Sequence, residues 1–330
     1  MGTPKISCAF YTGAETPDHI ALAERLGYHR AWVYDSPALC LDAWSALARA
    51  ADRTERIGLA TGVAVPKLRH LVVTASAIAT IESIAPGRFT LGVGTGFTGL
   101  RALGHKPMKW ADVAEYVTAL KTLLRGEPVQ WEGKTMRLMH ASGYLPKLPV
   151  EFDVYMATEG PKGFAVAKEH ADGVLTVNTE PGEGWQNSAR WAMGTVLDDG
   201  ESATSDRVWA AAGHAAVVIY HLYYEAGLDL NTLPGGKEWG EMISSLSEEE
   251  RHLSLHKGHL MEVSEHDDRL IPRETVSALT FTGTVDELRA RVDDMAAKGI
   301  TEVVYQPAGP DIPRELEAFA RLVPQKATAS

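Results

Sequence analysis

Short apolar runs alternate with segments of helical periodicity along the first part of the chain. The runs typical of buried strands lie at 6–10, 31–34, 57–63 and 89–93. The segments with apolar residues at helical spacing lie between and after them, at 16–26, 42–53, 70–84 and 110–125. This strand-helix alternation with connections of a few residues predicts parallel strands joined by right-handed crossovers.

The same alternation returns in the second part of the chain. Further strands are predicted at 154–157, 173–177, 191–197 and 302–305. Further helices are predicted at 161–170, 182–187, 206–226, 284–298 and 314–322. About eight β-α units without a break in composition favour an α/β fold of the TIM (β/α)8 barrel type over a doubly wound sheet. We therefore expect a single barrel domain over 1–330, with insertion segments.

Two segments interrupt the alternation and are predicted to be insertions. Residues 129–138 alternate in polarity on both sides of Glu132-Gly133, which predicts a small hairpin. Residues 231–272 are polar and contain the pair Gly235-Gly236. We expect this second segment to form a lid over one face of the barrel.

Composition excludes several classes of function. The chain has 330 residues, is 45% hydrophobic and carries a net charge of -11. An acidic chain without a basic cluster is a poor partner for nucleic acid or an anionic membrane. Its two cysteines, Cys8 and Cys40, form no CxxC pair and suit a reducing compartment. With no signal-peptide pattern and no run long enough to span a bilayer, a cytoplasmic location is expected.

The strand prediction also locates the candidate site. In a TIM barrel the active site lies at the carboxyl ends of the strands. Asp35 follows the second predicted strand and could be a turn residue or a hydrogen-bonding partner of a ligand; the neighbouring Tyr34 and Trp44 are expected to pack rather than to bind. The residues at these ends that are expected to bind a cofactor are Ser36, Gly62, Val63, Gly94, Thr95, Ala157, Thr158, Glu159, Gly160, Pro161 and Thr176.

Two glycine-containing strand ends suggest a flat, phosphorylated ligand. Gly92, Gly94 and Gly96 leave the fourth strand end almost without side chains, which suits either a tight turn or close approach of a flat ring. Gly160-Pro161 at a helix start leaves backbone N–H groups free at the positive end of the helix dipole. Since the chain lacks a P-loop lysine, a phosphate on a cofactor fits this seat better than a nucleoside triphosphate.

The predicted lid carries three histidines, His252, His256 and His259, on one helical face. A metal site is the least favoured interpretation, because the sequence does not identify a carboxylate that would complete the set of metal ligands. A solvated or capping face is an alternative. In the third interpretation, His256 or His259 faces the cofactor as a proton donor, since histidine titrates near neutral pH.

The chain resembles the luciferase-like (bacterial luciferase) superfamily of flavin-dependent oxidoreductases. The matching segments cover nearly the whole chain in the family's order, at 30–35, 56–63, 86–96, 160–163, 171–175 and 282–288. Within the superfamily it is similar to methylenetetrahydromethanopterin reductase-like proteins, which use the deazaflavin F420.

The resemblance implies a ring across the barrel mouth, above a non-prolyl cis peptide bond at Gly62-Val63, with the cofactor phosphate on the backbone of Thr158, Glu159 and Gly160. It also implies a homodimer. The chain departs from the pattern at Ser36, where many members have histidine, and at Phe97, where members that oxidise sugar phosphates have glutamate. Sugar phosphates are therefore disfavoured as substrates.

Three functional hypotheses follow from the resemblance. The leading one is an F420-dependent oxidoreductase that moves a hydride between the deazaflavin and a small organic substrate, with Asp35, His256 and His259 as candidate catalytic residues. An FMN-dependent monooxygenase that uses reduced flavin, oxygen and a separate flavin or F420 reductase is the second. A non-catalytic flavin-binding protein is the third, motivated by the missing histidine at position 36.

Overall fold

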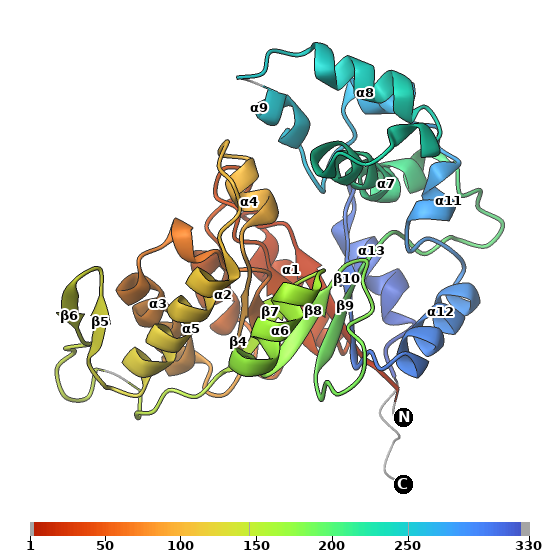
Figure 1. Ribbon diagram of the computed structural model, residues 1–330. Helices are drawn as coiled ribbons and strands as arrows, with labels where there is room; N and C mark the ends of the chain where they lie inside the picture. Colours follow the sequence, from red (N-terminus) through yellow and green to blue (C-terminus); the bar gives the residue numbers. More distant parts are fainter. Residues whose placement is uncertain (1–2, 145, 250, 325–330) are drawn as a thin grey trace, which may run out of the picture.

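Eight parallel strands close into a barrel in the computed structural model of the chain, which describes residues 3–144, 146–249 and 251–324 (Figure 1). Around the barrel the strands follow the order β1-β10-β9-β8-β7-β4-β3-β2. The predicted TIM barrel is confirmed. The barrel strands are β1 (Lys5–Phe10), β2 (Arg30–Val33), β3 (Gly58–Thr61), β4 (Phe89–Val93), β7 (Asp153–Ala157), β8 (Gly173–Thr176), β9 (Ser188–Met193) and β10 (Glu302–Gln306).

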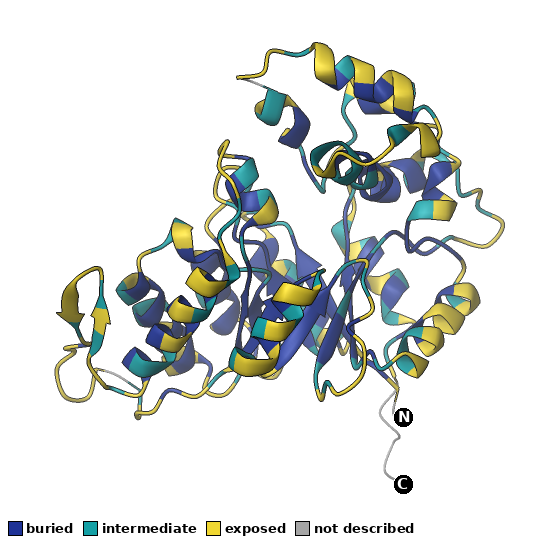
Figure 2. Ribbon diagram, viewed as in Figure 1, coloured by how far each residue is buried: buried dark blue, intermediate teal, exposed yellow. Residues whose placement is uncertain are grey.

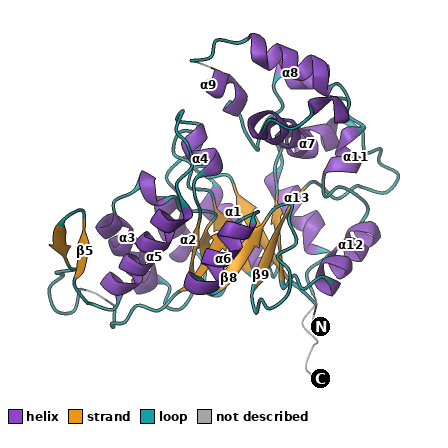
Figure 3. Ribbon diagram, in the orientation of Figure 1, coloured by secondary structure: helices purple, strands orange, loops and turns teal. Residues whose placement is uncertain are grey.

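Helices surround the strands on the outside (Figure 3). They begin where the sequence provides caps: the Asp42 carboxylate accepts the Ser45 N–H at 2.7 Å, and Thr284 and Glu287 form a capping box. These helices are α1 (Thr16–Arg25), α2 (Ala43–Ala51), α3 (Leu71–Ile84), α5 (Trp110–Leu124), α6 (Pro161–His170), α12 (Val285–Ala297) and α13 (Ile312–Ala320). The short helix α4 (Phe97–Arg101) follows β4 at the mouth of the barrel, and a 3-10 turn η1 at Pro66–Leu68 follows β3.

The segment before β9 differs from the sequence prediction. The helix predicted at 182–187 is wrong: those residues form bends and a loop. Gly182 and Gly184 adopt φ values of 75° and 85°, which no right-handed helix accommodates. The strand predicted at 191–197 instead starts at Ser188 and ends at Met193. Beyond it, Val196 pairs only through an isolated bridge to Gly283.

A lobe of helices, residues 206–279, stands over one end of the barrel (Figure 1). It has its own apolar core, which includes Trp209, Tyr220 and Trp239, and its helices turn their buried faces inward (Figure 2). The lobe therefore includes α7 and α11 on either side of the segment predicted as a lid. Its elements are α7 (Asp206–Ala226), η2 (Leu230–Thr232), α8 (Gly236–Ser245), α9 (Arg251–His256), α10 (Glu265–Leu270) and α11 (Thr275–Leu279).

The other insertion is a two-stranded antiparallel hairpin, β5 (Val129–Trp131) and β6 (Lys134–Met136). The predicted domain also includes residues 1–2, 145, 250 and 325–330, which lie outside the described residues. Of these, residue 250 belongs to the predicted lid. Within the described part of the chain, no helix combines the length and the hydropathy that crossing a bilayer requires.

A buried carboxylate attaches the lobe to the barrel. Glu315 on α13 is 3% exposed and accepts a hydrogen bond from the Arg207 guanidinium of α7 at 3.0 Å. It also accepts bonds from the hydroxyls of Thr195 at 2.6 Å and Tyr305 at 2.9 Å. Because a buried charge is stable only when paired, this network fixes the start of α7 and with it the position of the lobe above the strand ends.

Candidate active site at the mouth of the barrel

A cavity of about 480 Å³ lies between the carboxyl ends of the barrel strands and the lobe. The strand ends contribute its floor, including Tyr34, Gly62 and Gly94, while α7 contributes Val218, His221, Leu222 and Glu225. His259 and Leu260, after α9, complete the lobe side. The cavity therefore occupies the position at which barrels of this type place their active sites.

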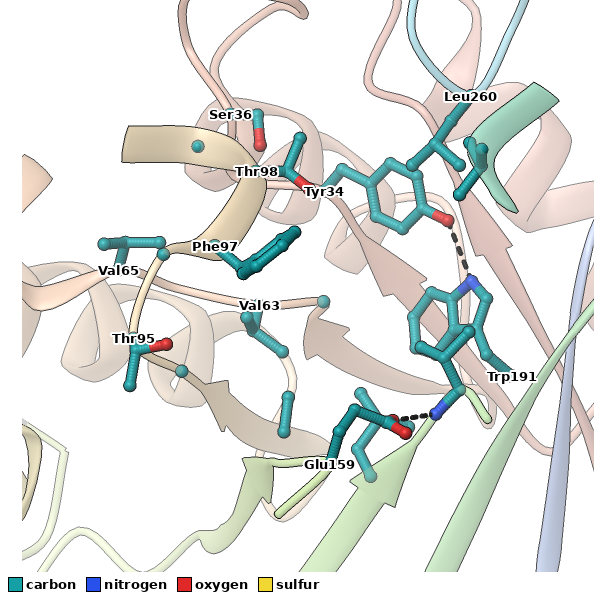
Figure 4. A pocket seen from close by; sticks show the side chains of 18 of the residues that line it. Tyr34, Ser36, Val63, Val65, Thr95, Phe97, Thr98, Glu159, Trp191 and Leu260 are labelled. Atoms are coloured by element: carbon teal, nitrogen blue, oxygen red, sulfur yellow. Dashed lines mark hydrogen bonds between the residues drawn. The ribbon is translucent and has the colours of Figure 1, made fainter. Parts of the chain in front are cut away.

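One wall of the cavity is aromatic. Trp191 Nε1 donates a hydrogen bond to the Tyr34 hydroxyl at 2.8 Å, and the two rings stack with centroids 5.7 Å apart (Figure 4). The Tyr34 hydroxyl in turn donates to Gln306 Oε1. Burial raises the pKa of Tyr34, so its hydroxyl stays protonated. Tyr34, expected only to pack, therefore both packs and faces the cavity.

Close packing requires glycine at position 92 and leaves little room for a side chain at position 94. A Cβ on Gly92 would lie 2.1 Å from the carbonyl oxygen of Thr61, and one on Gly94 would lie 3.1 Å from Cγ2 of Val63. The non-prolyl cis peptide bond expected at Gly62-Val63 is present. Gly62, Val63 and Gly94 all line the cavity, so its floor is backbone and small side chains that leave room for a flat ring.

The start of α6 has the features of an anion-binding site. Proline stands in its first turn and no side chain caps it, so its first backbone N–H groups lack an intrahelical acceptor. The preceding Thr158, Glu159 and Gly160 line the cavity. The Glu159 carboxylate accepts the N–H groups of Asn178 at 3.1 Å and Thr179 at 2.8 Å. Its charge is thus directed to the loop after β8, and the helix end stays available to a phosphate.

The predicted site residues divide into two groups. Those that line the cavity are Ser36, Gly62, Val63, Gly94, Thr95, Ala157, Thr158, Glu159, Gly160 and His259. Asp35, Pro161, Thr176 and His256 do not line it. Asp35 is 5% exposed, and its carboxylate accepts the Trp44 Nε1–H at 3.2 Å on the α2 side. Burial raises the pKa of Asp35 and the bond from Trp44 opposes that shift. The Asp35 carboxylate is therefore bonded to Trp44 rather than exposed to the cavity.

The histidines group differently from the sequence expectation. His256 and His259 lie together, but their third neighbour is His221 from α7, and a half-buried His252 stays outside the group. Nδ1 of His221 and Nδ1 of His259 are 3.2 Å apart. Burial lowers the pKa of His221 to about 4 and that of His259 well below its usual value, which leaves both rings neutral at neutral pH.

Several lining residues were not identified from the sequence. His221, Leu222 and Glu225 come from a helix whose docking no local pattern specifies. Trp191 was assigned to the start of its strand, whereas it lies near the strand's carboxyl end, where a barrel site is expected. The other lining residues that were not among those predicted to bind are Tyr11, Leu39, Val65, Gly96, Phe97, Thr98, Gly99, Trp110, Leu175, Val177, Asn178, Met193, Val218 and Leu260.

The charged side chains on the cavity wall are acidic. Among the described residues that line it, the charged side chains are Glu159 and Glu225, with neither lysine nor arginine. Arg101 lies close by but bonds to Glu225 at 3.5 Å. A second phosphate, as on a sugar phosphate, would therefore find no cation on this wall.

The sequence profile described as luciferase-like monooxygenase matches residues 7–302. The chain belongs to this family. Luciferase-like members similar to it include the 5,10-methylenetetrahydromethanopterin reductase of Archaeoglobus fulgidus, 26% identical over 92% of both chains. The F420-dependent glucose-6-phosphate dehydrogenase of Intrasporangium calvum is 28% identical, over 96% of this chain and 95% of the relative.

Solved structures agree with the luciferase-like assignment at the level of the fold. The F420-dependent tetrahydromethanopterin reductase of Methanopyrus kandleri superposes with a TM-score of 0.70 at 20% identity, covering 98% of this chain and 99% of that one. The chain is thus a luciferase-like oxidoreductase with distant homology to F420-dependent enzymes.

Proposed function

We propose that this protein transfers a hydride between F420 and a small, uncharged organic substrate. The observation that carries the proposal is the pairing of a glycine floor with an uncapped helix start in one cavity. The glycines of the cavity floor leave room for a planar ring, and the uncapped start of α6 offers backbone N–H groups to a cofactor phosphate. The sequence relatives whose names include F420 support the choice of cofactor.

Different residues of the cavity would hold the ring and the phosphate of the cofactor. Gly62, Val63 and Gly94 would lie against the ring face, and the backbone of Thr158 to Gly160, with the first turn of α6, would hold the phosphate. Ser36 and Thr95, which line the cavity, would offer hydroxyls to polar edges of the ring. When bound, F420 supplies or accepts the hydride. The chain's own contribution is to hold the reacting carbons in contact and exclude water.

The substrate would lie on the opposite side, between the aromatic wall of Tyr34 and Trp191 and the lobe. Since the described wall lacks cationic side chains, we infer an uncharged substrate, such as an alcohol or a ketone. His259 is the predicted proton-handling residue that reaches the cavity, whereas His256 stands behind it. A neutral His259 could donate its ring N–H proton to the oxygen of a ketone that receives the hydride, and take up the hydroxyl proton of an alcohol that gives one up.

Cofactor binding tests the proposal. The purified chain is titrated with F420 and with FMN, oxidised and reduced, and binding is followed by fluorescence. We expect tighter binding of F420, and F420-linked turnover of neutral alcohols or ketones but not of glucose 6-phosphate. Tighter binding of FMN together with uptake of oxygen would instead support the monooxygenase hypothesis, which the family description favours. Tight binding without turnover of any substrate would favour the non-catalytic hypothesis.

A further inference from the structure

The lobe brings three buried imidazoles together beside the cavity. His221 is 6% exposed, His256 is 2% exposed and His259 is 7% exposed. Each offers a ring nitrogen within 4.8 Å of a nitrogen from each of the others, a geometry that could hold a metal ion. His221 and His259 also line the cavity, so the group borders it directly.

The distance between two of these nitrogens matches a coordination sphere. Nδ1 of His221 and Nδ1 of His259 are 3.2 Å apart. Two nitrogens bound tetrahedrally to one Zn²⁺ at ~2.0–2.1 Å are about 3.3 Å apart. These two rings could therefore bind one ion with little movement, after the proton they share moves to an outer nitrogen.

The third ring has the hydrogen bond that metal-bound histidines usually make. Nε2 of His256 is 3.2 Å from the Oε1 atom of Glu225, so Nε2 carries the proton. Its Nδ1 is then a lone pair, and it is buried without a hydrogen-bond partner among the described residues. A carboxylate on the far nitrogen orients a ligand histidine and makes it more basic. A buried lone pair without a partner is costly in a purely structural cluster.

We propose that His221, His256 and His259 bind one divalent transition metal ion of the zinc class, with its fourth coordination position open to the cavity. Three neutral imidazoles with one open position are the ligand set of a catalytic rather than a structural zinc site.

The open position gives the ion a chemical role beside the cofactor cavity. It can accept a water molecule or an uncharged oxygen atom of a ligand, such as a carbonyl or hydroxyl oxygen. A zinc-bound oxygen is polarised, and zinc-bound water has a pKa near 7. The cavity would thus contain a Lewis acid on its lobe side. The site itself depends only on residues of this chain and not on the identity of the cofactor.

Metal titration of the full-length chain without cofactor tests the site. After treatment with a chelator, the protein is titrated with Co²⁺ and with Zn²⁺, measuring stoichiometry by calorimetry and the visible spectrum of bound Co²⁺. We expect about one ion per chain and the intense visible bands of four-coordinate Co²⁺. Absence of stoichiometric binding, or the weak spectrum of an octahedral surface ion, would overturn the proposal.

Matched variants locate the ion. His256→Gln and His259→Gln should weaken Zn²⁺ binding at least about 100-fold, and Glu225→Gln about 10–100-fold through His256. His252→Gln, on the same helix but outside the group, should bind as the wild type does. Equal binding by all four variants would contradict the assignment. If the His256→Gln and His259→Gln chains fail to fold, Glu225→Gln and the Co²⁺ spectrum of the wild type still decide the question.

Discussion

The indole Nε1 of Trp191 donates a hydrogen bond to the hydroxyl of Tyr34 at 2.8 Å, joining β9 to the end of β2 across the barrel mouth. Because the Tyr34 hydroxyl also donates to Gln306, it links three strand ends in one wall of the cavity. Replacing Tyr34 by phenylalanine would leave the indole N–H of Trp191 and the amide oxygen of Gln306 unpaired. We expect Tyr34→Phe to lower the free energy of unfolding by ~1–3 kcal/mol, measured by urea denaturation.

The same variant should also weaken binding of F420, because the indole ring loses the bond that orients it towards the cavity. Tyr144→Phe is the matched control, since Tyr144 is 82% exposed and outside the cavity. Unchanged stability and unchanged affinity in Tyr34→Phe would show that this wall is held by packing alone.

A second buried contact stabilises the opposite end of the barrel interior. Glu302 is 2% exposed and accepts hydrogen bonds from Arg30 at 2.8 Å and from Trp32 Nε1 at 3.0 Å. Glu302→Ala would leave the Arg30 guanidinium buried without its counter-charge. We expect a loss of ~3–5 kcal/mol in the free energy of unfolding, measured by chemical denaturation.

A double variant separates the two contributions to that loss. Arg30→Met combined with Glu302→Leu removes both charges and fills the space with apolar groups, and it should recover much of the lost stability. Glu317→Ala, on the exposed face of α13, should change stability little. If the double variant were as unstable as Glu302→Ala, lost packing rather than an unpaired charge would be the cause.

The barrel could be predicted from the sequence because its signals are local. Each strand is a short apolar run, and caps such as Asp42 and Thr284 mark helix starts. The segment before β9 was misassigned because Gly182 and Gly184 take left-handed conformations that residue type alone does not reveal. Local propensity predicts elements, and backbone conformations at glycine depend on the surrounding fold.

The candidate site was only half predictable for a related reason. The strand ends and the helix start at Gly160 could be located, because the barrel topology fixes which ends converge. The lobe side could not. His221 and Glu225 face the cavity because α7 docks on the barrel through long-range contacts, such as that of Arg207 with Glu315, 108 positions apart. No spacing within α7 indicates that contact, so the histidines were grouped along one helix instead of across two.

The glycine floor predicts a specific effect on cofactor affinity. A Cβ on Gly94 would lie 3.1 Å from Cγ2 of Val63 and 3.6 Å from the Cβ of Ala157, at the surface where the ring is proposed to lie. We expect Gly94→Ala to weaken F420 binding about tenfold or more, equivalent to ~1.4 kcal/mol, in the fluorescence titration. Gly13→Ala is the control, because its Cβ would meet nothing closer than 3.9 Å and Gly13 is outside the cavity. Equal affinities would place the ring elsewhere.

His214 on α7 predicts how stability depends on pH. It is 1% exposed, and neither ring nitrogen has a hydrogen-bond partner in the described part of the chain. Burial lowers its pKa from 6.5 to about 4. Between these values the unfolded chain binds a proton that the folded chain does not. The proton-linked contribution of His214 to the free energy of unfolding is therefore close to zero above pH 6.5, and it lowers stability as the pH falls towards 4, by ~2 kcal/mol at pH 5.

Replacing His214 by leucine removes this proton-linked term and leaves the other buried histidines in place. The loss of unfolding free energy between pH 7 and pH 5 should therefore be smaller by ~2 kcal/mol in His214→Leu than in the wild type. Urea denaturation of both proteins at the two pH values, with a chelator present, measures this difference directly. Comparing the change with pH, rather than stability at one pH, cancels any packing effect of leucine. Equal losses in the two proteins would mean that the His214 ring is protonated in the folded state as readily as in the unfolded state.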